Sequence, residues 1–373
     1  MAEIVVKDLR KEFGDFVAVE GSNFTVSDGE FFMLLGPSGC GKTTTLRMIA
    51  GLELPTSGDI LLGGENVAQK TARERDIAFV FQMFALYPHM NVYRNIAYPL
   101  TSQGMRPREV RARVNSIAQT LGITHLLKSP VGGLSGGDRQ RVALGRAIVR
   151  EPKAFLMDEP LGALDAEFRE KMAEELRALH DRMGATTVYV THDQLEAMQM
   201  GDKIVVMNHG VVEQWGAPQD IYDEPASLFV ADFIGSPPMN ILKPEGVIAQ
   251  GHLPVAGAAL ALPDFLGPVP TTPVLLGVRP EHVRLNDAAP LRGHVLGTEY
   301  LGTTQIITIE TAAGTMRVRA PSADRLSVGE TVGLSLNTPT LSVFDAEDGQ
   351  AIPVRRTLSR SSVAAIAGAP AHG

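Results

Sequence analysis

The sequence predicts an α/β fold over residues 1–235, followed by a small all-β unit, a sandwich or a barrel, over residues 236–355. In the first part, short apolar runs alternate with helical patterns, which is typical of a mostly parallel sheet. At Gly235-Ser236-Pro237-Pro238 the hydrophobic pattern changes, and beyond this segment prolines and glycines interrupt short alternating runs. With 373 residues, of which 44% are hydrophobic, the chain can bury a core in each part.

The α/β part combines buried strands with helices. Phe31–Leu35 is a continuous apolar run, followed at once by a glycine-rich turn and a predicted helix over Lys42–Ala50. Residues 95–150 show no strand pattern and are expected to form a helical insert. Its helices are predicted at 107–121 and from Ser135 to the residue before Pro152. Further strands are predicted at 154–157, 186–190 and 203–207.

The all-β part is predicted from alternating runs at 274–279, 293–300, 305–310, 315–320 and 331–336. Beyond them the chain ends in a small, basic, Ser- and Ala-rich tail, and we expect residues 356–373 to be unstructured.

Composition excludes several classes of protein. A formal net charge of −8 argues against a chain held mainly by nucleic-acid phosphates. The single cysteine, Cys40, excludes an intrachain disulfide and a cysteine-based zinc cage, and suits a reducing compartment. No apolar run approaches the ~18 residues of a membrane span, and the charged N-terminus lacks the apolar core of a signal peptide. We therefore expect a soluble, cytoplasmic protein.

A phosphate-binding pattern follows the first buried strand. The segment Gly36-Pro37-Ser38-Gly39-Cys40-Gly41-Lys42-Thr43, continued by Thr44, matches G-x-x-x-x-G-K-[ST] in full. Its glycines allow successive backbone N–H groups to surround a phosphate at the helix N-terminus. Lys42 can reach the β and γ phosphates, and the Thr43 hydroxyl can ligate Mg²⁺. The alternative is a strand-to-helix turn without a ligand.

An acidic pair follows a second buried strand. Asp158 and Glu159 come directly after the apolar run at 154–157. Because ligands in such sheets lie at the carboxyl ends of strands, we expect Asp158 near the metal held by Thr43. Glu159 is the candidate general base for water that attacks the γ-phosphate. The alternative is an acid that caps a helix before Pro160. The sequence therefore predicts a P-loop NTPase that hydrolyses ATP with Mg²⁺.

Further motifs identify a family. The segment 134–141, LSGGDRQR, is similar to the signature sequence of ABC ATPases, and Gln82, Asp165 and His192 stand in that family's order. The chain closely resembles the ATPase subunits of maltose- and glycerol-3-phosphate-type importers. The resemblance implies an ABC cassette with a helical insert. It also implies a C-terminal OB-type (TOBE) regulatory domain that begins near GVRPEH, residues 277–282.

The resemblance also implies roles for individual residues. Two copies of the chain would enclose two ATP molecules, with Ser135, Gly136 and Gly137 on the γ-phosphate bound by the opposite copy and Asp165 coupling the two sites. Gln82 would sense Mg²⁺ and the attacking water while linking the site to the permease. His192 would contact the γ-phosphate. Phe13 would stack on adenine, although a core role for Phe13 and stacking by Phe16 are alternatives.

Two segments depart from the family pattern. Asp138 stands where the family usually has Gln, and Ser135-x-x-Asp138 forms a capping-box pattern. A negative charge near phosphate is unfavourable, so we expect the Asp138 carboxylate to point away from the nucleotide. Gly162-Ala163 replaces the usual Ser-Asn of the loop before Asp165, the residue expected to couple the two sites.

The expected partners are a second ATPase subunit, two membrane permease subunits and, indirectly, an extracytoplasmic solute-binding protein. By resemblance, the apolar segment 84–90 lines the groove for a permease helix, with plain burial as the alternative. The solute would be a sugar or a polyol phosphate; polyamine, metal and anion importers use related ATPases. Two other functions remain as alternatives: a nucleic-acid ATPase, and an effector-binding protein whose working part is the β domain.

Overall fold

The computed structural model of this chain describes residues 2–162, 164 and 166–355. The chain divides into two compact units, Met1–Pro218 and Gln219–Gly373. Each unit has its own hydrophobic core. The sequence pattern predicted a boundary at residue 235, whereas the structure divides the chain earlier, after Pro218.

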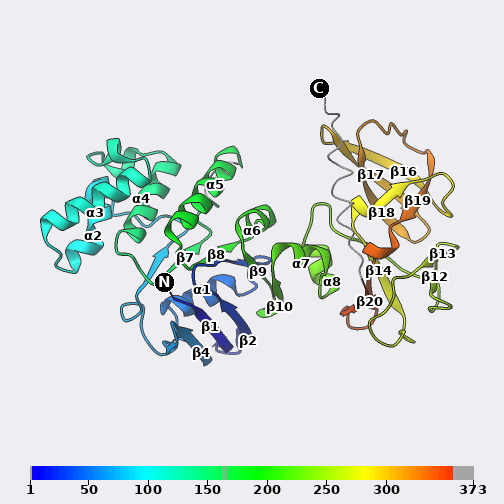
Figure 1. Ribbon diagram of the computed structural model, residues 1–373, viewed down its shortest axis with the longest axis horizontal. Helices are drawn as coiled ribbons and strands as arrows, with labels where there is room; N and C mark the ends of the chain where they lie inside the picture. The colour runs from blue at the N-terminus through cyan, green and yellow to red at the C-terminus, as the bar shows by residue number, and fades with distance from the viewer. Residues whose placement is uncertain (1, 163, 165, 356–373) are drawn as a thin grey trace, which may run out of the picture. The chain divides into compact units, whose positions relative to one another are not determined.

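The first unit is built on a six-stranded sheet, in which all strands but β10 run parallel (Figure 1). Its order is β10 (Val211–Gly216), β9 (Lys203–Asn208), β3 (Phe31–Leu35), β8 (Thr187–Thr191), β7 (Ala154–Asp158) and β6 (Ile77–Val80). The strand predictions for β3, β7, β8 and β9 are therefore confirmed. Every residue of β3 and β8 is buried, which explains why β3 is a continuous apolar run and why β8 is rich in apolar residues.

A second, antiparallel sheet covers the other side of the phosphate-loop helix, α1 (Lys42–Ala50). Its strands are, in order, β2 (Phe16–Val26), β1 (Ile4–Phe13), β4 (Ser57–Leu62) and β5 (Glu65–Asn66). Leu46 and Ile49 of α1 share a core cluster with Ile4 and Val6 of β1 and with Leu34 of β3. The packing of both sheets onto α1 therefore fixes the helix that begins at the phosphate loop.

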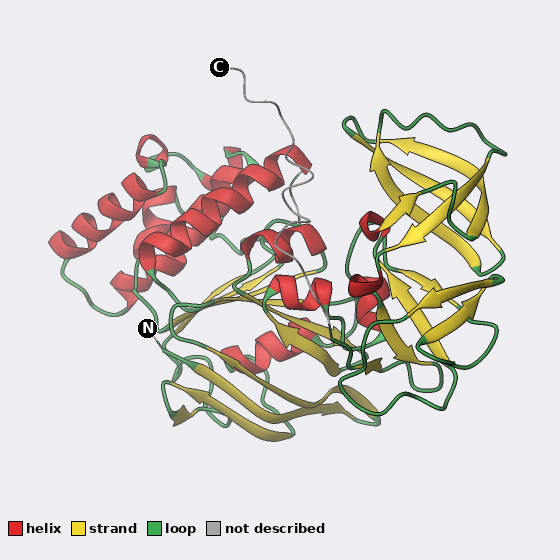
Figure 2. Cartoon of the chain, turned by 45° about the vertical axis from the view of Figure 1, so that its right-hand side comes forward, coloured by secondary structure: helices red, strands yellow, loops and turns green. Residues whose placement is uncertain are grey.

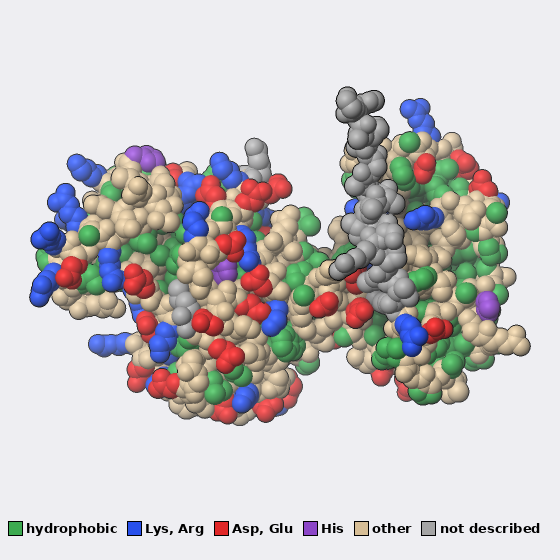
Figure 3. All heavy atoms as spheres, viewed as in Figure 1, with side chains coloured by type: hydrophobic (Ala, Val, Ile, Leu, Met, Phe, Trp, Pro, Cys, Tyr) green, Lys and Arg blue, Asp and Glu red, His purple; other side chains and the backbone are tan. Residues whose placement is uncertain are grey.

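The predicted helical insert is present, and its secondary structure elements are helices. It contains α2 (Val92–Ser102), α3 (Pro107–Thr120), the short η1 (Thr124–Leu126) and η2 (Val131–Gly133), and α4 (Gly136–Ile148). Asn91 caps α2 by accepting a hydrogen bond from the backbone N–H of Arg94, 2.9 Å away. Lys and Arg side chains gather over the surface of this insert (Figure 3), where Arg106, Arg108 and Arg111 are exposed. The remaining helices of this unit are α5 (Ala166–Met183) and α6 (Gln194–Met200).

The second unit is dominated by strands (Figure 2). One sheet has the order β11 (Asn240–Leu242), β14 (Val274–Val278), β20 (Ser342–Asp345), β21 (Ala351–Ile352). The other has the order β15 (Val283–Leu285), β19 (Thr331–Leu336), β16 (Leu291–Tyr300), β17 (Thr304–Thr311), β18 (Gly314–Pro321), and a hairpin pairs β12 (His252–Val255) with β13 (Ala258–Ala261). All these pairings are antiparallel, and the outer strands β15 and β18 contact each other. The nearly closed sheet confirms the predicted OB-like, all-β fold.

The position of the unit boundary has a physical cause in Arg279, which is 2% exposed. Its guanidinium donates to the carbonyl oxygens of Tyr222 at 2.7 Å and Ala231 at 3.1 Å, and also to that of Ile234. These acceptors lie on and after α7 (Pro218–Asp223) and α8 (Leu228–Phe233). Because a buried guanidinium must keep its hydrogen bonds, both helices stay with the β domain.

Candidate active site

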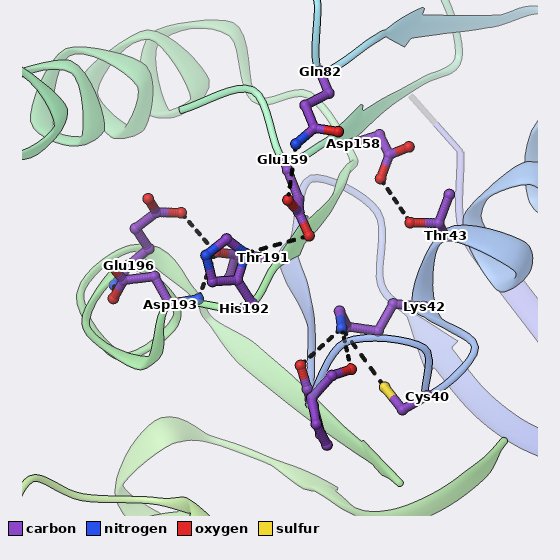
Figure 4. Close-up of polar contacts among 12 residues, drawn as sticks. Cys40, Lys42, Thr43, Gln82, Asp158, Glu159, Thr191, His192, Asp193 and Glu196 are labelled. Atoms are coloured by element: carbon purple, nitrogen blue, oxygen red, sulfur yellow. Dashed lines mark hydrogen bonds and ion pairs between the residues drawn. The ribbon is translucent and has the colours of Figure 1, made fainter. Parts of the chain in front are cut away.

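The predicted phosphate loop joins the end of β3 to the start of α1. Gly41 caps the helix with φ of 102°, and a Cβ there would lie 2.6 Å from the Ala18 carbonyl oxygen, so only glycine fits. Lys42 is 5% exposed, and its Nζ donates to the carbonyl oxygens of Gly36 at 2.7 Å and Pro37 at 2.8 Å. Figure 4 shows this ammonium inside the turn of the loop. A phosphate bound by Lys42 would exchange with these carbonyls.

Asp158 ends β7 and lies next to the loop. The Thr43 hydroxyl donates to Asp158 Oδ1 at 3.0 Å (Figure 4). Burial raises the pKa of Asp158, and the hydrogen bond from Thr43 acts in the opposite direction. Within the described residues, no group of three or more His, Cys, Asp or Glu side chains could hold a metal on its own. One carboxylate and one hydroxyl fit Mg²⁺, which completes its shell with water and substrate phosphate oxygens.

Glu159 contacts two other predicted catalytic side chains, those of Gln82 and His192. Gln82 Nε2 donates to Glu159 Oε2 at 3.2 Å, and His192 Nδ1 lies 3.3 Å from Glu159 Oε1 (Figure 4). The Glu159 backbone has φ of 43°, which is uncommon for a residue with a side chain, and its N–H donates to the Val190 carbonyl at 3.1 Å. The sheet holds this conformation and directs Glu159 between residues that follow β6 and β8.

Ser135 caps α4 and forms a separate cluster. Within the described portion of the chain, no hydrogen bond or ion pair joins Ser135, Gly136 or Gly137 to the phosphate loop. The Ser135 hydroxyl accepts from the Asp138 N–H at 3.2 Å and donates to Asp138 Oδ2 at 2.7 Å. A Cβ on Gly137 would lie 2.2 Å from the Phe168 ring, so a larger residue here would displace that ring.

Asp138 takes part in the capping box that the spacing Ser135-x-x-Asp138 predicted. Its carboxylate accepts a hydrogen bond from the Ser135 hydroxyl. Arg141 also lies 3.3 Å from Asp138 Oδ1, and it pairs with Glu175 at 3.0 Å. The capping geometry brings the carboxylate to Ser135, and Arg141 compensates its charge.

The remaining residues predicted to contact nucleotide are Phe13, with Phe16 as its alternative, and Asp165. Phe13 is 48% exposed and Phe16 is 63% exposed, so neither ring is part of the core. Asp165 and Ala163 lie outside the described residues.

The segment at 84–90 follows Gln82 and is fixed to α4. Arg146 donates to the carbonyl oxygens of Phe84 at 2.9 Å and Ala85 at 2.7 Å. Phe84 is buried, and Leu86 packs against the core of the insert, whereas Met83 is 79% exposed. Burial therefore accounts for Phe84 and Leu86.

Sequence reasoning missed the polar residues behind His192. The Glu196 side chain accepts hydrogen bonds from the hydroxyls of Tyr189 at 3.0 Å and Thr191 at 2.8 Å. Burial raises its pKa. Asp193 caps α6, with Oδ1 accepting from the Leu195 N–H at 2.8 Å and from the Glu196 N–H. The spacing Asp193-x-x-Glu196 resembles a capping box and was the available signal.

A phosphate loop after β3, acids at the end of β7 and a histidine after β8 define this protein as a P-loop nucleoside triphosphatase. Residues 19–162 match the family described as ABC transporter, and residues 276–344 match the TOBE domain family. The chain belongs to the ABC transporter family, and it is an ATP-binding subunit that hydrolyses ATP.

Relatives cover nearly the whole chain. The trehalose import ATP-binding protein SugC of Mycobacterium tuberculosis is 44% identical over 387 residues, covering 94% of this chain and 98% of that protein. The sn-glycerol-3-phosphate import ATP-binding protein UgpC of Burkholderia thailandensis is 46% identical over 365 residues, covering 94% of this chain and 99% of that protein. A dimeric structure of a bacterial ABC transporter cassette matches with TM-score 0.52 and 32% identity, covering 58% of this chain and 98% of that chain. Within the described residues, no helix is long and apolar enough to cross a membrane.

Proposed function

We propose that this chain powers the import of a sugar or a polyol phosphate through a separate membrane permease, by hydrolysing ATP at the site of Lys42, Asp158 and Glu159. The placement of Glu159 between Gln82 and His192, beside the Thr43–Asp158 pair, carries the proposal. The relatives named for trehalose and sn-glycerol-3-phosphate import support the solute class.

The phosphate loop binds the triphosphate. Backbone N–H groups of residues 38–44 surround the β phosphate, and the N-terminus of α1 adds positive potential. Lys42 exchanges its bonds to Gly36 and Pro37 for oxygens of the β and γ phosphates. The exposed ring of Phe13 stacks on the adenine.

Glu159 acts as the general base. Its carboxylate accepts a proton from water as that water attacks the γ-phosphate. Gln82 orients the same carboxylate and the water, and His192 contacts the γ-phosphate from the other side of Glu159. Thr43, Asp158 and Gln82 would hold Mg²⁺, which would neutralise negative charge on the phosphate oxygens.

The assembly contains two copies of this chain on two permease subunits. Ser135, Gly136 and Gly137 contact the γ-phosphate bound by the other copy, and Asp165 couples the two sites. The permease docks near residues 84–90, at the inner face of the cell membrane, and an extracytoplasmic protein delivers the solute to it. Gln82 lies directly before this segment, so closure of the dimer and movement of the permease are linked.

Glu159→Gln tests the catalytic proposal. The variant should bind ATP as the wild type does and lose about 10²- to 10⁴-fold in turnover, because the amide cannot accept the proton of water. Glu151→Gln is a matched control, since Glu151 also has a positive φ, of 53°, and its side chain is 75% exposed. Near-normal hydrolysis by Glu159→Gln would remove Glu159 from the mechanism. Stimulation of the reconstituted complex by a polyamine or a metal instead of a sugar would overturn the solute class.

A further inference from the structure

Arg169 of α5 connects two loops of the candidate active site. Its Nη2 donates to the carbonyl oxygen of Leu164 at 3.1 Å, in the loop that follows Glu159. Its Nη1 lies 3.4 Å from Asp193 Oδ2, and its Nε lies 3.8 Å from Glu196 Oε1. One guanidinium therefore contacts both the loop that leads to position 165 and the turn that carries His192.

The place of His192 depends on the backbone around it. Its own side chain is 55% exposed, and Glu159 is its ion-pair partner among the residues that the structure describes. The residues on either side are fixed: the Thr191 hydroxyl donates to Glu196 at 2.8 Å and accepts from the Asp193 N–H at 2.9 Å. Figure 4 shows these groups behind His192.

The positive charge of Arg169 lies beside two carboxylates of the turn at 191–196, those of Asp193 and Glu196. Glu196 is 6% exposed, and a buried carboxylate is stable as an anion only with a nearby cation or several donors. Burial raises the pKa of Glu196, and Arg169 acts in the opposite direction. Without Arg169, Glu196 and Asp193 would lose their shared cation, and the turn at 191–196 would relax.

We propose that Arg169 is a positioning residue for hydrolysis: it fixes His192 through Asp193 and Glu196, and it makes that position depend on the loop at Leu164. The inference rests on the proposed role of His192. Since Arg169 contacts both loops, a shift of one loop moves the other.

The same helix supplies a matched control. Arg177 also lies on α5, and its side chain is 29% exposed, the same value as that of Arg169. It pairs with Asp181 and Asp202, both at 2.9 Å, and donates to the Met200 carbonyl at 2.7 Å. It contacts neither loop, so Arg177→Met removes a comparable network without touching the site.

The experiment measures kcat, KM and ATP affinity for the full chain as Arg169→Met, Arg169→Lys and Arg177→Met. Arg169→Met should lower kcat by roughly 10- to 100-fold, because small misplacements of a reacting group have effects of that size. ATP affinity should stay within about twofold of wild type, since the phosphate loop is untouched. Arg169→Lys should give intermediate activity, and Arg177→Met should keep wild-type kcat.

A double-mutant cycle with His192→Ala identifies the route of the effect. If Arg169 acts through His192, then Arg169→Met adds little to the loss in His192→Ala. An equal loss in both backgrounds would overturn the inference, as would a kcat loss in Arg177→Met as large as that in Arg169→Met. The proposed function fails separately, if Glu159→Gln and His192→Ala both hydrolyse ATP normally. If Glu159→Gln and His192→Ala lose activity but Arg169→Met keeps it, the proposed function stands and only the role of Arg169 is contradicted.

Discussion

Asp138→Gln is expected to leave ATP hydrolysis unchanged or to raise it. In the structure, the Ser135 hydroxyl donates its hydrogen bond to Asp138 Oδ2, 2.7 Å away. A hydroxyl has one proton to donate, so Ser135 must give up this bond before it can donate to a phosphate. Gln at position 138 removes the negative charge and offers a weaker, neutral acceptor.

The size of the effect follows from the two kinds of hydrogen bond. A bond to a charged acceptor contributes about 1.5–3 kcal/mol, and a neutral one about 0.5–1.5 kcal/mol. The difference of about 1 kcal/mol corresponds to roughly fivefold in the fraction of Ser135 hydroxyls free to bind phosphate. Repulsion between Asp138 and a phosphate adds about 3 kcal/mol at ~6 Å and an effective dielectric of ~20. Arg141, 3.3 Å from Asp138, offsets much of that repulsion.

Steady-state hydrolysis over a range of ATP concentrations tests this reasoning. For Asp138→Gln, kcat/KM should lie between the wild-type value and a value about fivefold higher, by the hydrogen-bond difference given above. Glu175→Gln is the control, because it removes the other acid beside Arg141 and leaves the Ser135–Asp138 pair intact. A tenfold loss in Asp138→Gln would refute the argument. An equal gain in Glu175→Gln would show that the charge around Arg141, and not Ser135, sets the rate.

Three further outcomes follow from buried groups. Lys42→Ala should weaken ATP binding by at least about tenfold in a nucleotide titration, since charge-assisted bonds to phosphate are lost; unchanged affinity would contradict the phosphate role. Arg75→Met should lower the free energy of unfolding by about 1–3 kcal/mol in urea, because the carbonyls of Met48 and Ile49 at the end of α1 lose their donor. The raised pKa of Glu196 stabilises the protein below pH 4.5, and this stabilisation is lost as the pH rises through the raised pKa. The melting temperature of Glu196→Gln should therefore rise relative to wild type from pH 4.5 upwards, and a constant difference would exclude this role.

The candidate site could be predicted where its signals are contiguous. The phosphate loop, the Asp158-Glu159 pair and His192 each follow a short buried strand, and parallel strands bring their carboxyl ends to one edge of a sheet. That rule alone places Thr43 near Asp158, and the structure gives 3.0 Å between their oxygens. The helical insert was predictable for a similar reason, because its amphipathic period is local.

Contacts between distant segments could not be predicted in this way. Arg169 looks like an ordinary charged residue on a helix, and its role depends on how α5 packs beside the turn at 191–196. The unit boundary depends on Arg279, which binds carbonyls more than 40 residues earlier in the chain. In each case, hydrogen bonds that form only on folding determine the outcome.

The polar side chains of this site are bonded to other parts of the protein, so ligand binding is an exchange of partners. Lys42 donates to two loop carbonyls, Thr43 donates to Asp158, and Ser135 donates to Asp138. Lys42 is buried, and a buried polar group left without a partner loses about 1–3 kcal/mol, so an incoming ligand must replace the two bonds of Lys42 with bonds of at least equal strength. A ligand with a single charged group could replace the bonds of only one of these side chains. A chain of phosphates presents charged oxygens to Lys42 and Thr43 together, and in the proposed dimer its last phosphate would also meet Ser135 of the other copy. A triphosphate can therefore replace more of these bonds than a shorter phosphate can.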